Sequence, residues 1–583
     1  MRYRGLLKLA VFGAIAGTPI AATAQTTAFD NWTPVTDEML ANPADGDWLM
    51  WRRNYGNWGY SPLDQVNADN VDDLNLAWAV TLDPASNEMT PLVHDGVMFM
   101  VQGCDFTQAV DATNGALLWE YRRDVVDHAA GLACGNRNPV LYGDKLYIAT
   151  HDAFLIALDV RTGEVVWEQQ VGDWTIGHHY SGGPQIFGGK LIAGMSGCYY
   201  INSRCWISAH DTETGEELWR TYTIPGPGEF GDETWNGVPL EARYGGSAWN
   251  AGAYAPELGL IYYGVAVPIP WGSPQRGTGD GDVLYTNSTI AIDEDTGEIV
   301  WYFQHMANEY WDLDHPFARM VVDTAVAPTA GEVQWIADDL TPGETRTVVT
   351  GIPGKTGIVW TLDAATGDFL WATPTNYQNA MVDVEPENRR GISNPELMVP
   401  IGVETFVCPS AGGGINWQSP AYSPQTNAIY APVNNVCNFY TLNEVTPTIG
   451  AHHGSARTRA VIWEGANGNV GAFTAVSVET GEFLWQHIQR AGFGSSVLTT
   501  GGGLVVTGDD ANLLRVYRAT DGEILWEQRV SASLRGYPMT YEVDGTQYIA
   551  FPVGGNGRYR ARTPEIRFPS GGNMLYVFAL PEG

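Results

Sequence analysis

The sequence predicts an all-β fold, specifically an eight-bladed β-propeller whose blade repeats end on tryptophan. A unit recurs in which apolar residues alternate, a turn such as Asp293 to Gly297 reverses the chain, and a second strand ends on an aromatic residue. The 22 tryptophans and 68 glycines fit many short strands joined by tight turns. The eight tryptophans that end the units are Trp78, Trp119, Trp167, Trp219, Trp301, Trp371, Trp485 and Trp526.

The spacing of these tryptophans supports a propeller. Their separations are 41, 48, 52, 82, 70, 114 and 41 residues, and the shortest matches one four-stranded blade. A blade cannot bury both of its faces alone, so neighbours must stack and the ring must close. The tail 573–580 can supply the closing strand beside the N-terminal one. The long insertions 221–246 and 373–412 are expected as loops on one face, where substrate selectivity would be set.

The first 24 residues have the pattern of a secretory signal peptide. Arg2, Arg4 and Lys8 precede or flank a short apolar run, and Ala22-Thr-Ala24 offers a cleavage site before Gln25. The apolar run is too short to span a bilayer, and no later segment is apolar for long enough. We therefore expect a signal peptide over 1–24, a propeller over 25–583, and a protein of the periplasm or the extracellular medium, without a transmembrane segment.

Charge and cysteine usage narrow the function classes. The formal charge is −35, or −38 without the three basic residues of the leader, so the surface repels phosphate backbones and nucleic acid is excluded as a partner. Six cysteines in an exported chain suggest disulfides, with 15 connectivities if all of them pair. Cys198 with Cys205 could close a small loop, and Cys408 with Cys437 a larger one. There is no Cys-x-x-Cys-His motif, so this chain carries no covalent haem.

Two carboxylates stand out as candidates for chemistry. Asp312 and Asp314 follow the strand that ends near Trp301, and they lie beside Trp311 and His315. Alternate residues of an extended segment point to one side. A rigid sheet could therefore hold both carboxylates in a ligand cavity, although a solvent-facing or capping role is the plain alternative for Asp314.

The repeat Asp-x-x-Thr-Gly-x-x-x-Trp, together with Trp311-Asp312, resembles the pyrroloquinoline quinone (PQQ)-dependent alcohol dehydrogenases over nearly the whole mature chain. The resemblance implies an eight-bladed propeller that holds the quinone and a metal ion near its axis. The motifs that carry it include Asn87-Glu88-Met-Thr-Pro, Cys134-Gly-Asn-Arg137, Gly245-Gly-Ser247-Ala-Trp249 and Gly354-Lys355-Thr-Gly. It implies cofactor-binding roles for Glu88, Arg137, Thr150, Ser181, Ser247, Trp249, Lys355, Asn416 and Trp417, and metal-binding roles for Asp312 and Asp314.

This set of residue types suits a planar quinone that carries three carboxylates. Such a cofactor needs a flat aromatic platform, cations for its carboxylates and charge-assisted donors at its oxygens. Cys408 and Cys437 also resemble a disulfide of the family. Taken singly, Lys355 or Arg137 would more often be a solvated surface charge, and it is the shared order and context that give them the ligand roles.

Three departures from the family pattern affect the site. Ala133 precedes Cys134 where many relatives carry adjacent cysteines, and Cys134 is free to pair with Cys104 instead. The metal-binding Glu of the family should fall within 196–200, where no carboxylate is present. The metal-binding Asn should fall within 264–268, where Val267 takes its place.

Two functions from different classes follow. The first is an exported dehydrogenase that oxidises an alcohol, a sugar alcohol or a bulky secondary hydroxyl to a carbonyl, with sorbose-type, polyvinyl alcohol and mycotoxin substrates all open. Asp312 would act as general base, and Lys355 would polarise the quinone together with calcium or, as second choice, a lanthanide. Electrons would leave to a separate carrier such as a cytochrome c. The alternative is a non-catalytic propeller scaffold of the outer-membrane assembly type, which has no need for Glu88, Arg137, Lys355 and Asp312 together.

Overall fold

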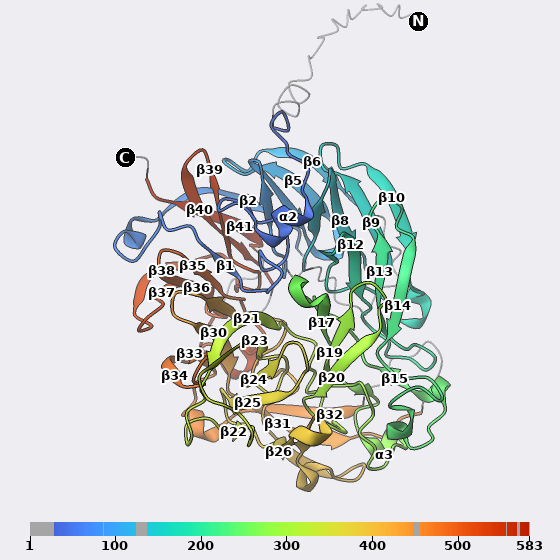
Figure 1. The fold of residues 1–583 in the computed structure, drawn as a ribbon. Coiled ribbons are helices and arrows are strands. Elements are labelled where there is room, and N and C mark those ends of the chain that lie inside the picture. The colour runs from blue at the N-terminus through green and yellow to red at the C-terminus, as the bar shows by residue number, and fades with distance from the viewer. Residues whose placement is uncertain are drawn as a thin grey trace, which may run out of the picture.

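The fold is all-β, as predicted. The computed structural model describes residues 28–84, 87–123, 137–446, 455–555, 557–567 and 572–581, and the leader predicted over 1–24 lies outside them. Within these ranges the α-helices are short, namely α2 (Asp37–Ala41) and α3 (Ser273–Arg276). Figure 1 shows the sheets following one another along the chain around the molecule.

In the N-terminal half the strands form antiparallel sheets from consecutive segments. The first sheet contains β3 (Leu92–His94), β4 (Val97–Val101), β5 (Thr107–Asp111) and β6 (Leu117–Tyr121). The second contains β7 (Val140–Tyr142), β8 (Lys145–Ala149), β9 (Phe154–Asp159) and β10 (Val165–Gln170). The third contains β11 (Gln185–Phe187), β12 (Lys190–Gly194), β13 (Trp206–Asp211) and β14 (Glu217–Tyr222). The fourth contains β16 (Ala253–Ala255), β17 (Leu260–Gly264), β19 (Ser288–Asp293) and β20 (Ile299–Gln304), extended by β27 (Arg390–Ser393) and β26 (Met381–Glu385).

The C-terminal half continues this arrangement. One sheet contains β21 (Met320–Val326), β23 (Glu344–Gly351), β24 (Ile358–Asp363), β25 (Phe369–Pro374) and β22 (Trp335–Ile336). The next contains β29 (Ala421–Ser423), β30 (Ala428–Asn434), β33 (Gly471–Ser477) and β34 (Phe483–Gln489). It is followed by β35 (Leu498–Thr500), β36 (Leu504–Gly508), β37 (Leu513–Arg518) and β38 (Ile524–Arg529), with β1 (Tyr60–Ser61) at the edge.

The two ends of the chain meet in one sheet. Its strands are β39 (Met539–Val543), β40 (Thr546–Val553), β41 (Met574–Ala579) and β2 (Asn75–Thr81). β2 pairs antiparallel with β41, so that Asn75 lies opposite Ala579 and Thr81 opposite Met574. Figure 1 shows the C-terminal strands against the N-terminal β2. The prediction that the tail supplies the closing strand is confirmed.

Six tryptophans on outer strands contact the turn of a neighbouring sheet. The indole N–H donates to a backbone carbonyl in the following turn, in the pairs Trp78 to Ala112 (3.1 Å), Trp119 to Val160 (2.7 Å), Trp167 to Thr212 (3.0 Å), Trp219 to Glu294 (3.1 Å), Trp301 to Ala364 (3.1 Å) and Trp485 to Ala519 (2.9 Å). The same rings lie over the turn glycines. A Cβ on Gly163, which has φ +72°, would sit 2.5 Å from the Trp119 ring. Only glycine fits there, which explains why the turn and the tryptophan recur together.

Parts of the insertions that were expected as loops form strands, including β26 and β27. The sheet of β28 (Glu404–Val407), β31 (Val436–Leu442) and β32 (Ala456–Ile462) lies apart from the others, and β15 (Tyr244–Gly245) pairs with β18 (Pro268–Ile269). Disulfides join Cys198 to Cys205 and Cys408 to Cys437, as the sequence suggested. Cys104 is also disulfide-bonded, whereas Cys134 lies outside the described residues.

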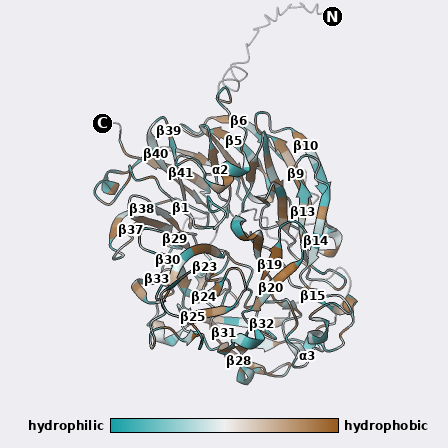
Figure 2. Cartoon of the chain, in the orientation of Figure 1, coloured by the Kyte–Doolittle hydropathy of each residue, from teal (hydrophilic) through white to brown (hydrophobic). Residues whose placement is uncertain are grey.

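The apolar residues lie mainly on the strands. The inner strands β4, β8 and β12 are buried along almost their whole length, and Figure 2 draws strands such as β19 largely in brown. Outer strands such as β10 are more exposed. Among the residues that the structure describes, no helix is long and apolar enough to cross a membrane.

We predict that Trp119→Ala lowers the free energy of unfolding by about 3–5 kcal/mol, the usual cost of deleting a large buried aromatic side chain. Trp119 is 5% exposed and loses both its ring contact with Gly163 and its hydrogen bond to Val160. Chemical denaturation measures the change, and Trp119→Phe, which keeps a ring, should cost less. If the free energy of unfolding of Trp119→Ala stays within about 1 kcal/mol of the wild-type value, Trp119 does not stabilise the contact between the two sheets.

Candidate active site

Asp312, Lys355 and Asp314 form one buried charged cluster. The loop between β20 and β21 carries both carboxylates, and the loop between β23 and β24 carries the lysine. Lys355 Nζ lies 2.9 Å from Asp312 Oδ1 and 2.8 Å from Asp314 Oδ2. The backbone N–H of Lys355 also donates to the Asp314 carbonyl, at 2.8 Å. The side chain of Asp312 is 22% exposed and that of Asp314 only 9%, so Asp312 is the carboxylate that a ligand reaches first.

The surroundings of Asp312 bring the pKa of its carboxyl close to neutral pH. Burial raises the pKa of Asp312, the Lys355 ammonium lowers it, and the nearby Asp314 raises it again, which leaves a pKa of about 7. Burial alone would lower the pKa of Lys355, but its attraction to Asp312 and Asp314 outweighs burial and raises it. The cluster thus combines a carboxyl that can exchange a proton near neutral pH with a permanently charged ammonium.

Asp314 ties the lysine to a neighbouring backbone segment. Its Oδ1 accepts a hydrogen bond from the backbone N–H of Val267 at 3.1 Å, while its Oδ2 faces Lys355. Val267 stands where the sequence comparison with the family expected an Asn. Tyr199 belongs to the segment where the family pattern would place a Glu. Burial raises the pKa of Tyr199, and the charges of Asp314 and Asp312 raise it further, so this phenol lies near the two carboxylates.

A second buried cluster is built around Glu88. Glu88 is 6% exposed, and its Oε2 lies 2.7 Å from Arg137 Nη2 while its Oε1 accepts from Arg535. Burial by itself would raise the pKa of Glu88, but its attraction to Arg137 and Arg535 outweighs burial, and the pKa lies below the ordinary value. One carboxylate is therefore shared by two guanidinium groups, which leaves positive charge for a further anion.

Aromatic rings face these guanidinium groups. The Arg137 guanidinium carbon lies 5.2 Å from the Trp249 ring centroid and 5.6 Å from that of Trp417, and the Arg535 carbon lies 5.4 Å from the Trp417 centroid. Trp249 is half-buried and stacks edge-on against Phe317 at 5.1 Å. Trp417 is buried. The structure thus brings together Glu88, Arg137, Trp249 and Trp417, four of the residues to which the resemblance gives cofactor-binding roles.

Of the smaller polar residues, Ser181 contacts the second cluster, and the others bond to groups outside it. Ser181 belongs to the second cluster, because its carbonyl accepts from Arg137 at 2.9 Å and its hydroxyl lies 3.3 Å from the Trp249 carbonyl. Ser247 donates to the Met195 carbonyl at 3.4 Å, and Asn416 Nδ2 to the Gly412 carbonyl at 3.1 Å. Thr150 uses its hydroxyl in its own turn, where it contacts Asp152 at 2.5 Å and accepts from the Phe154 N–H at 3.1 Å.

The segment around residues 412–417 connects the two clusters. The Gly414 N–H donates to the Lys355 carbonyl at 2.8 Å. Arg558 Nη1 donates to the Gly412 carbonyl at 3.1 Å, and the charge of Arg558 lowers the pKa of both Asp312 and Glu88. Arg558 therefore lies within electrostatic reach of both carboxylates.

Arg535 and Arg558 were missed by sequence reasoning because no motif marks them. A topological signal was available for Arg535. It follows an outer strand, β38, as Glu88 follows β2, Ser181 follows β10 and Asp312 follows β20. In a closed ring of sheets, the loops that follow outer strands lie on one face. A charged residue in the loop after β38, such as Arg535, is therefore a candidate site residue.

Comparison with known proteins identifies the family. Residues 48–376 and 454–549 match the glucose/ethanol/alcohol dehydrogenase β-propeller domain of the PQQ family. The chain belongs to the PQQ-dependent alcohol dehydrogenase family. It is an enzyme of the quinoprotein oxidoreductase class, and the alternative of a non-catalytic scaffold is not favoured.

Several members of this family are similar to most of this chain. The dehydrogenase subunit of the quinone-dependent alcohol dehydrogenase of Gluconacetobacter polyoxogenes is 31% identical over 95% of this chain and 78% of the relative. Quinoprotein alcohol dehydrogenase PedH of Pseudomonas putida is 30% identical over 90% of this chain and 89% of the relative.

Solved structures of the family have the same fold. The quinohemoprotein alcohol dehydrogenase ADHIIG of Pseudomonas putida HK5 superposes with a TM-score of 0.84 at 28% identity, over 94% of this chain and 82% of that one. A europium-containing methanol dehydrogenase gives a TM-score of 0.83 at 28% identity, over 94% of this chain and all of that one.

The residues present fit the quinone of this family. Arg137, Arg535 and Lys355 are cations in or beside the two clusters, and Trp249 offers a partly exposed aromatic face. Arg137 Nε and Trp417 Nε1 are buried and have no hydrogen-bond partner within the described part of the chain, which leaves donors for a ligand. A planar tricarboxylate matches this combination of cations, spare donors and flat rings.

The fit to a metal ion depends on two carboxylates. Asp312 and Asp314 supply the oxygen donors that a hard cation prefers. In the ranges described, no group of three or more His, Cys, Asp or Glu side chains is arranged to hold a metal. The donor type therefore suits calcium or a lanthanide, and these two carboxylates alone, within the described residues, are fewer ligands than a complete coordination shell requires.

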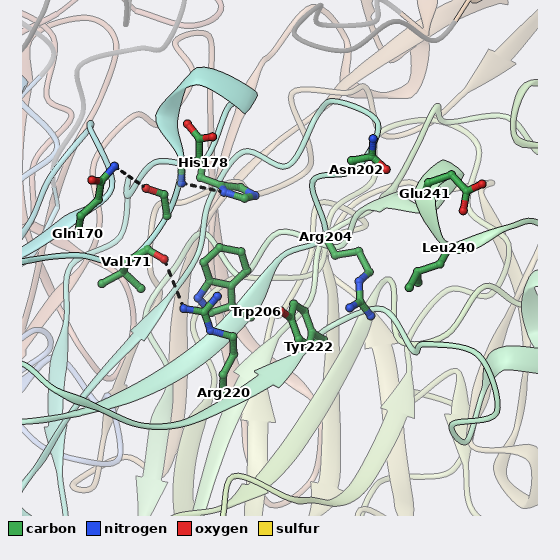
Figure 3. A pocket seen from close by; sticks show the side chains of 12 residues that line it. Gln170, Val171, His178, Asn202, Arg204, Trp206, Arg220, Tyr222, Leu240 and Glu241 are labelled. Atoms are coloured by element: carbon green, nitrogen blue, oxygen red, sulfur yellow. Dashed lines mark hydrogen bonds between the residues drawn. The ribbon is translucent and has the colours of Figure 1, made fainter.

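A surface cavity of about 640 Å³ lies elsewhere and contains none of the predicted site residues. Figure 3 shows its wall, where Arg220 covers the Trp206 ring and the buried His178 ring packs edge-on against the same indole, with 4.7 Å between centroids. Its other lining residues include Arg204, Tyr222 and Glu241. The chemistry expected of this family is concentrated in the two charged clusters and not in this cavity.

We predict that Glu88→Gln lowers stability by about 3–5 kcal/mol at pH 7, because it leaves the buried Arg137 and Arg535 without their shared anion. Since the pKa of Glu88 is lowered by folding, its contribution is present above the ordinary carboxyl value of 4.5 and is lost as the pH falls through the folded pKa. The gap in melting temperature between wild type and variant should therefore narrow at acidic pH.

Thermal melts of both proteins between neutral and acidic pH measure this gap. Glu213→Gln is a matched control, because Glu213 pairs with Lys145 on the surface and is 70% exposed, so its loss should change the melting temperature little. A Glu88→Gln gap that stays constant with pH would show that the ion pair is not its source.

Proposed function

We propose that this chain is an exported PQQ-dependent dehydrogenase, with a leader over 1–24 and one eight-bladed propeller over 25–583. It oxidises an alcohol, a sugar alcohol or a bulky secondary hydroxyl to a carbonyl. The family supports the reaction, and the buried contact of Asp312 with Lys355 is the observation that carries the assignment to this site. The disulfides support a periplasmic or secreted location.

The proposal of eight tryptophan-ended blades is supported by the sheets and by the contacts between them. The sheets containing β4, β8, β12, β17, β23, β30, β36 and β40 each have at least four strands, and β2 completes the last one. The repeated bond from an indole to the next turn gives six of the proposed blades the same contact with a neighbour. The pairing of β2 with β41 joins the N-terminal and C-terminal segments in one sheet, as a closed ring requires.

Asp312 is proposed as the general base. Lys355 holds Asp312 Oδ1 at 2.9 Å, so Oδ2 is the oxygen that receives the hydroxyl proton of the substrate. When bound, PQQ supplies the acceptor for the hydride and a metal ion supplies Lewis acidity. Lys355 would place its ammonium beside the quinone oxygens, while Glu88, Arg137, Thr150, Ser181, Ser247, Trp249, Asn416 and Trp417 would bind and orient the ring.

Calcium is the metal we propose first and a lanthanide second, with Asp312 and Asp314 as ligands. The europium-containing relative supports the second choice. The insertions and the departures from the usual metal ligands favour a substrate bulkier than methanol, and sorbose-type, polyvinyl alcohol and mycotoxin substrates stay open. Because the sequence has no haem attachment motif, a separate acceptor such as a cytochrome c would take the electrons.

We predict that Asp312→Asn lowers turnover by about 10²–10⁴-fold, because it keeps size and polarity but removes the base. Alcohol-dependent dye reduction by purified protein loaded with PQQ and calcium measures the rate. Bound quinone, measured by absorbance, and the melting temperature serve as controls for folding. A loaded, folded variant with more than about half of wild-type turnover would remove Asp312 from the role of base.

We predict that Asp314→Ala weakens activation by metal without removing quinone binding. The variant loses one of two carboxylates that suit a hard cation and one of the two partners of Lys355. Titration of calcium and of a light lanthanide into metal-free, quinone-loaded protein gives the activation midpoint. If the midpoint stays at the wild-type value for both ions, Asp314 is not a metal ligand.

A further inference from the structure

Glu309 is a buried carboxyl that the proposed reaction leaves without a role. It is fully buried, three residues before Asp312. Its Oε1 accepts hydrogen bonds from the backbone N–H groups of Trp311 and Leu313, the latter at 2.8 Å. These are the two residues on either side of Asp312. One carboxyl oxygen thus binds the backbone immediately before and immediately after Asp312.

The backbone of Asp312 needs such support. Asp312 has φ +63°, in the left-handed region that residues with a side chain adopt only when their surroundings enforce it. Without the bonds from Trp311 and Leu313 to Glu309, the loop could relax to an ordinary conformation. The Asp312 carboxylate would then leave the position from which it contacts Lys355.

Glu309 is itself held in place by a second buried side chain. Arg276 Nη1 donates to the Glu309 carbonyl at 3.2 Å, and Arg276 Nη2 donates to Asn308 Oδ1 at 2.8 Å. The hydroxyl of Tyr440 donates to the Trp311 carbonyl on the other side of the loop. The loop that carries Asp312 is therefore fixed from both sides, and Glu309 is the group that acts directly on the two peptides around Asp312.

We propose that Glu309 is a positioning residue for the oxidation: it holds the Asp312 backbone in its left-handed conformation and so keeps the carboxylate beside Lys355. This inference rests on the proposed role of Asp312 as base. Glu309 does not contact the reacting atoms. It acts through the peptides at Trp311 and Leu313.

A neutral Glu309 is sufficient for this role. Burial raises the pKa of Glu309 to about 8 despite the two backbone hydrogen bonds, with smaller contributions from Asp312 and Asp314. Its Oε2 has no hydrogen-bond partner within the described residues. A glutamine has the same length, and its Oε1 can accept the same two bonds. Glu309→Gln is therefore the conservative variant, whereas Glu309→Ala removes the acceptor and Glu309→Asp withdraws it by one methylene.

The experiment compares these variants in the full, quinone-loaded protein. Hydrogen exchange followed by mass spectrometry reports the peptide that contains Trp311 and Leu313, and steady-state kinetics report kcat and KM. We expect exchange about tenfold or more faster in Glu309→Ala and Glu309→Asp, with kcat lower by about 10–100-fold and KM nearly unchanged. Glu309→Gln should keep both properties near wild type.

A matched control separates positioning from general destabilisation. Asp211 Oδ1 also accepts two backbone N–H bonds, from Glu213 at 3.0 Å and Thr214 at 2.8 Å, but in a blade turn. Asp211→Ala should speed exchange in its own turn and leave kcat unchanged. If Glu309→Ala does not fold, Glu309→Asp and Glu309→Gln still give the comparison.

The outcomes are distinct. Unchanged exchange at Trp311 and Leu313 in the alanine and aspartate variants would overturn the proposal, as would faster exchange with wild-type kcat. A Glu309→Gln protein as slow as Glu309→Ala would also overturn it, because a residue that acts through geometry must be rescued by the isosteric amide. Wild-type turnover in Asp312→Asn, with faster exchange in Glu309→Ala, would instead overturn the assignment of Asp312 as base.

Discussion

The structure depends on one repeated contact, in which an indole ring of an outer strand lies on the turn of the next sheet. The ring needs a turn without a Cβ, and the indole N–H needs a carbonyl in the same turn, so glycine and tryptophan are constrained together in neighbouring sheets. Trp371 departs from this pattern. Its ring still lies 3.2 Å from where a Cβ on Gly481 would be, but Val333, near β22, lies closer at 2.4 Å, and the Trp371 indole N–H has no hydrogen-bond partner within the described residues.

On this regular frame, the two charged clusters are built from loops that follow outer strands and from the β23–β24 loop that carries Lys355. Glu88 and Arg535 are 447 residues apart in sequence, yet they form an ion pair, because the sheet of β2 and β41 brings the start of the chain to its end. The protein as a whole is strongly acidic, but the two clusters gather Arg137, Arg535 and Lys355 around three carboxylates. Burial makes each of these charges unfavourable unless it is paired, so pairing orders both clusters, and the Glu88 cluster, with two guanidinium groups on one carboxylate, is the one suited to an anionic ligand.

Much of this arrangement could be predicted from the sequence, and the residues that could not share a physical reason. The turn and tryptophan repeat is local in sequence and therefore readable, as are Glu88, Arg137, Trp249 and Lys355, which stand in short motifs. Arg535 and Arg558 stand in no such motif, because their partners, Glu88 and Gly412, are distant in sequence and meet them only in the folded chain. Glu309 was hidden for a different reason. Its side chain accepts hydrogen bonds from backbone N–H groups. Since every residue except proline has a backbone N–H group, no pattern of side chains in the sequence predicts this interaction.

The charge of the Asp312 cluster limits what can occupy the site. Two carboxylates and one ammonium have a net charge of −1, and burial from water makes that excess costly. A hard cation bound at these oxygens would compete with the Lys355 ammonium, because Lys355 lies within 3 Å of one oxygen of each carboxylate. The other oxygen of Asp314 already accepts a hydrogen bond from the Val267 N–H. Asp312 Oδ2 is then the oxygen available without displacing a partner. In the proposed site, metal binding and proton acceptance would therefore fall on one carboxyl group, and a loop that fixes the Asp312 backbone would matter more than it would where separate residues carried the two tasks.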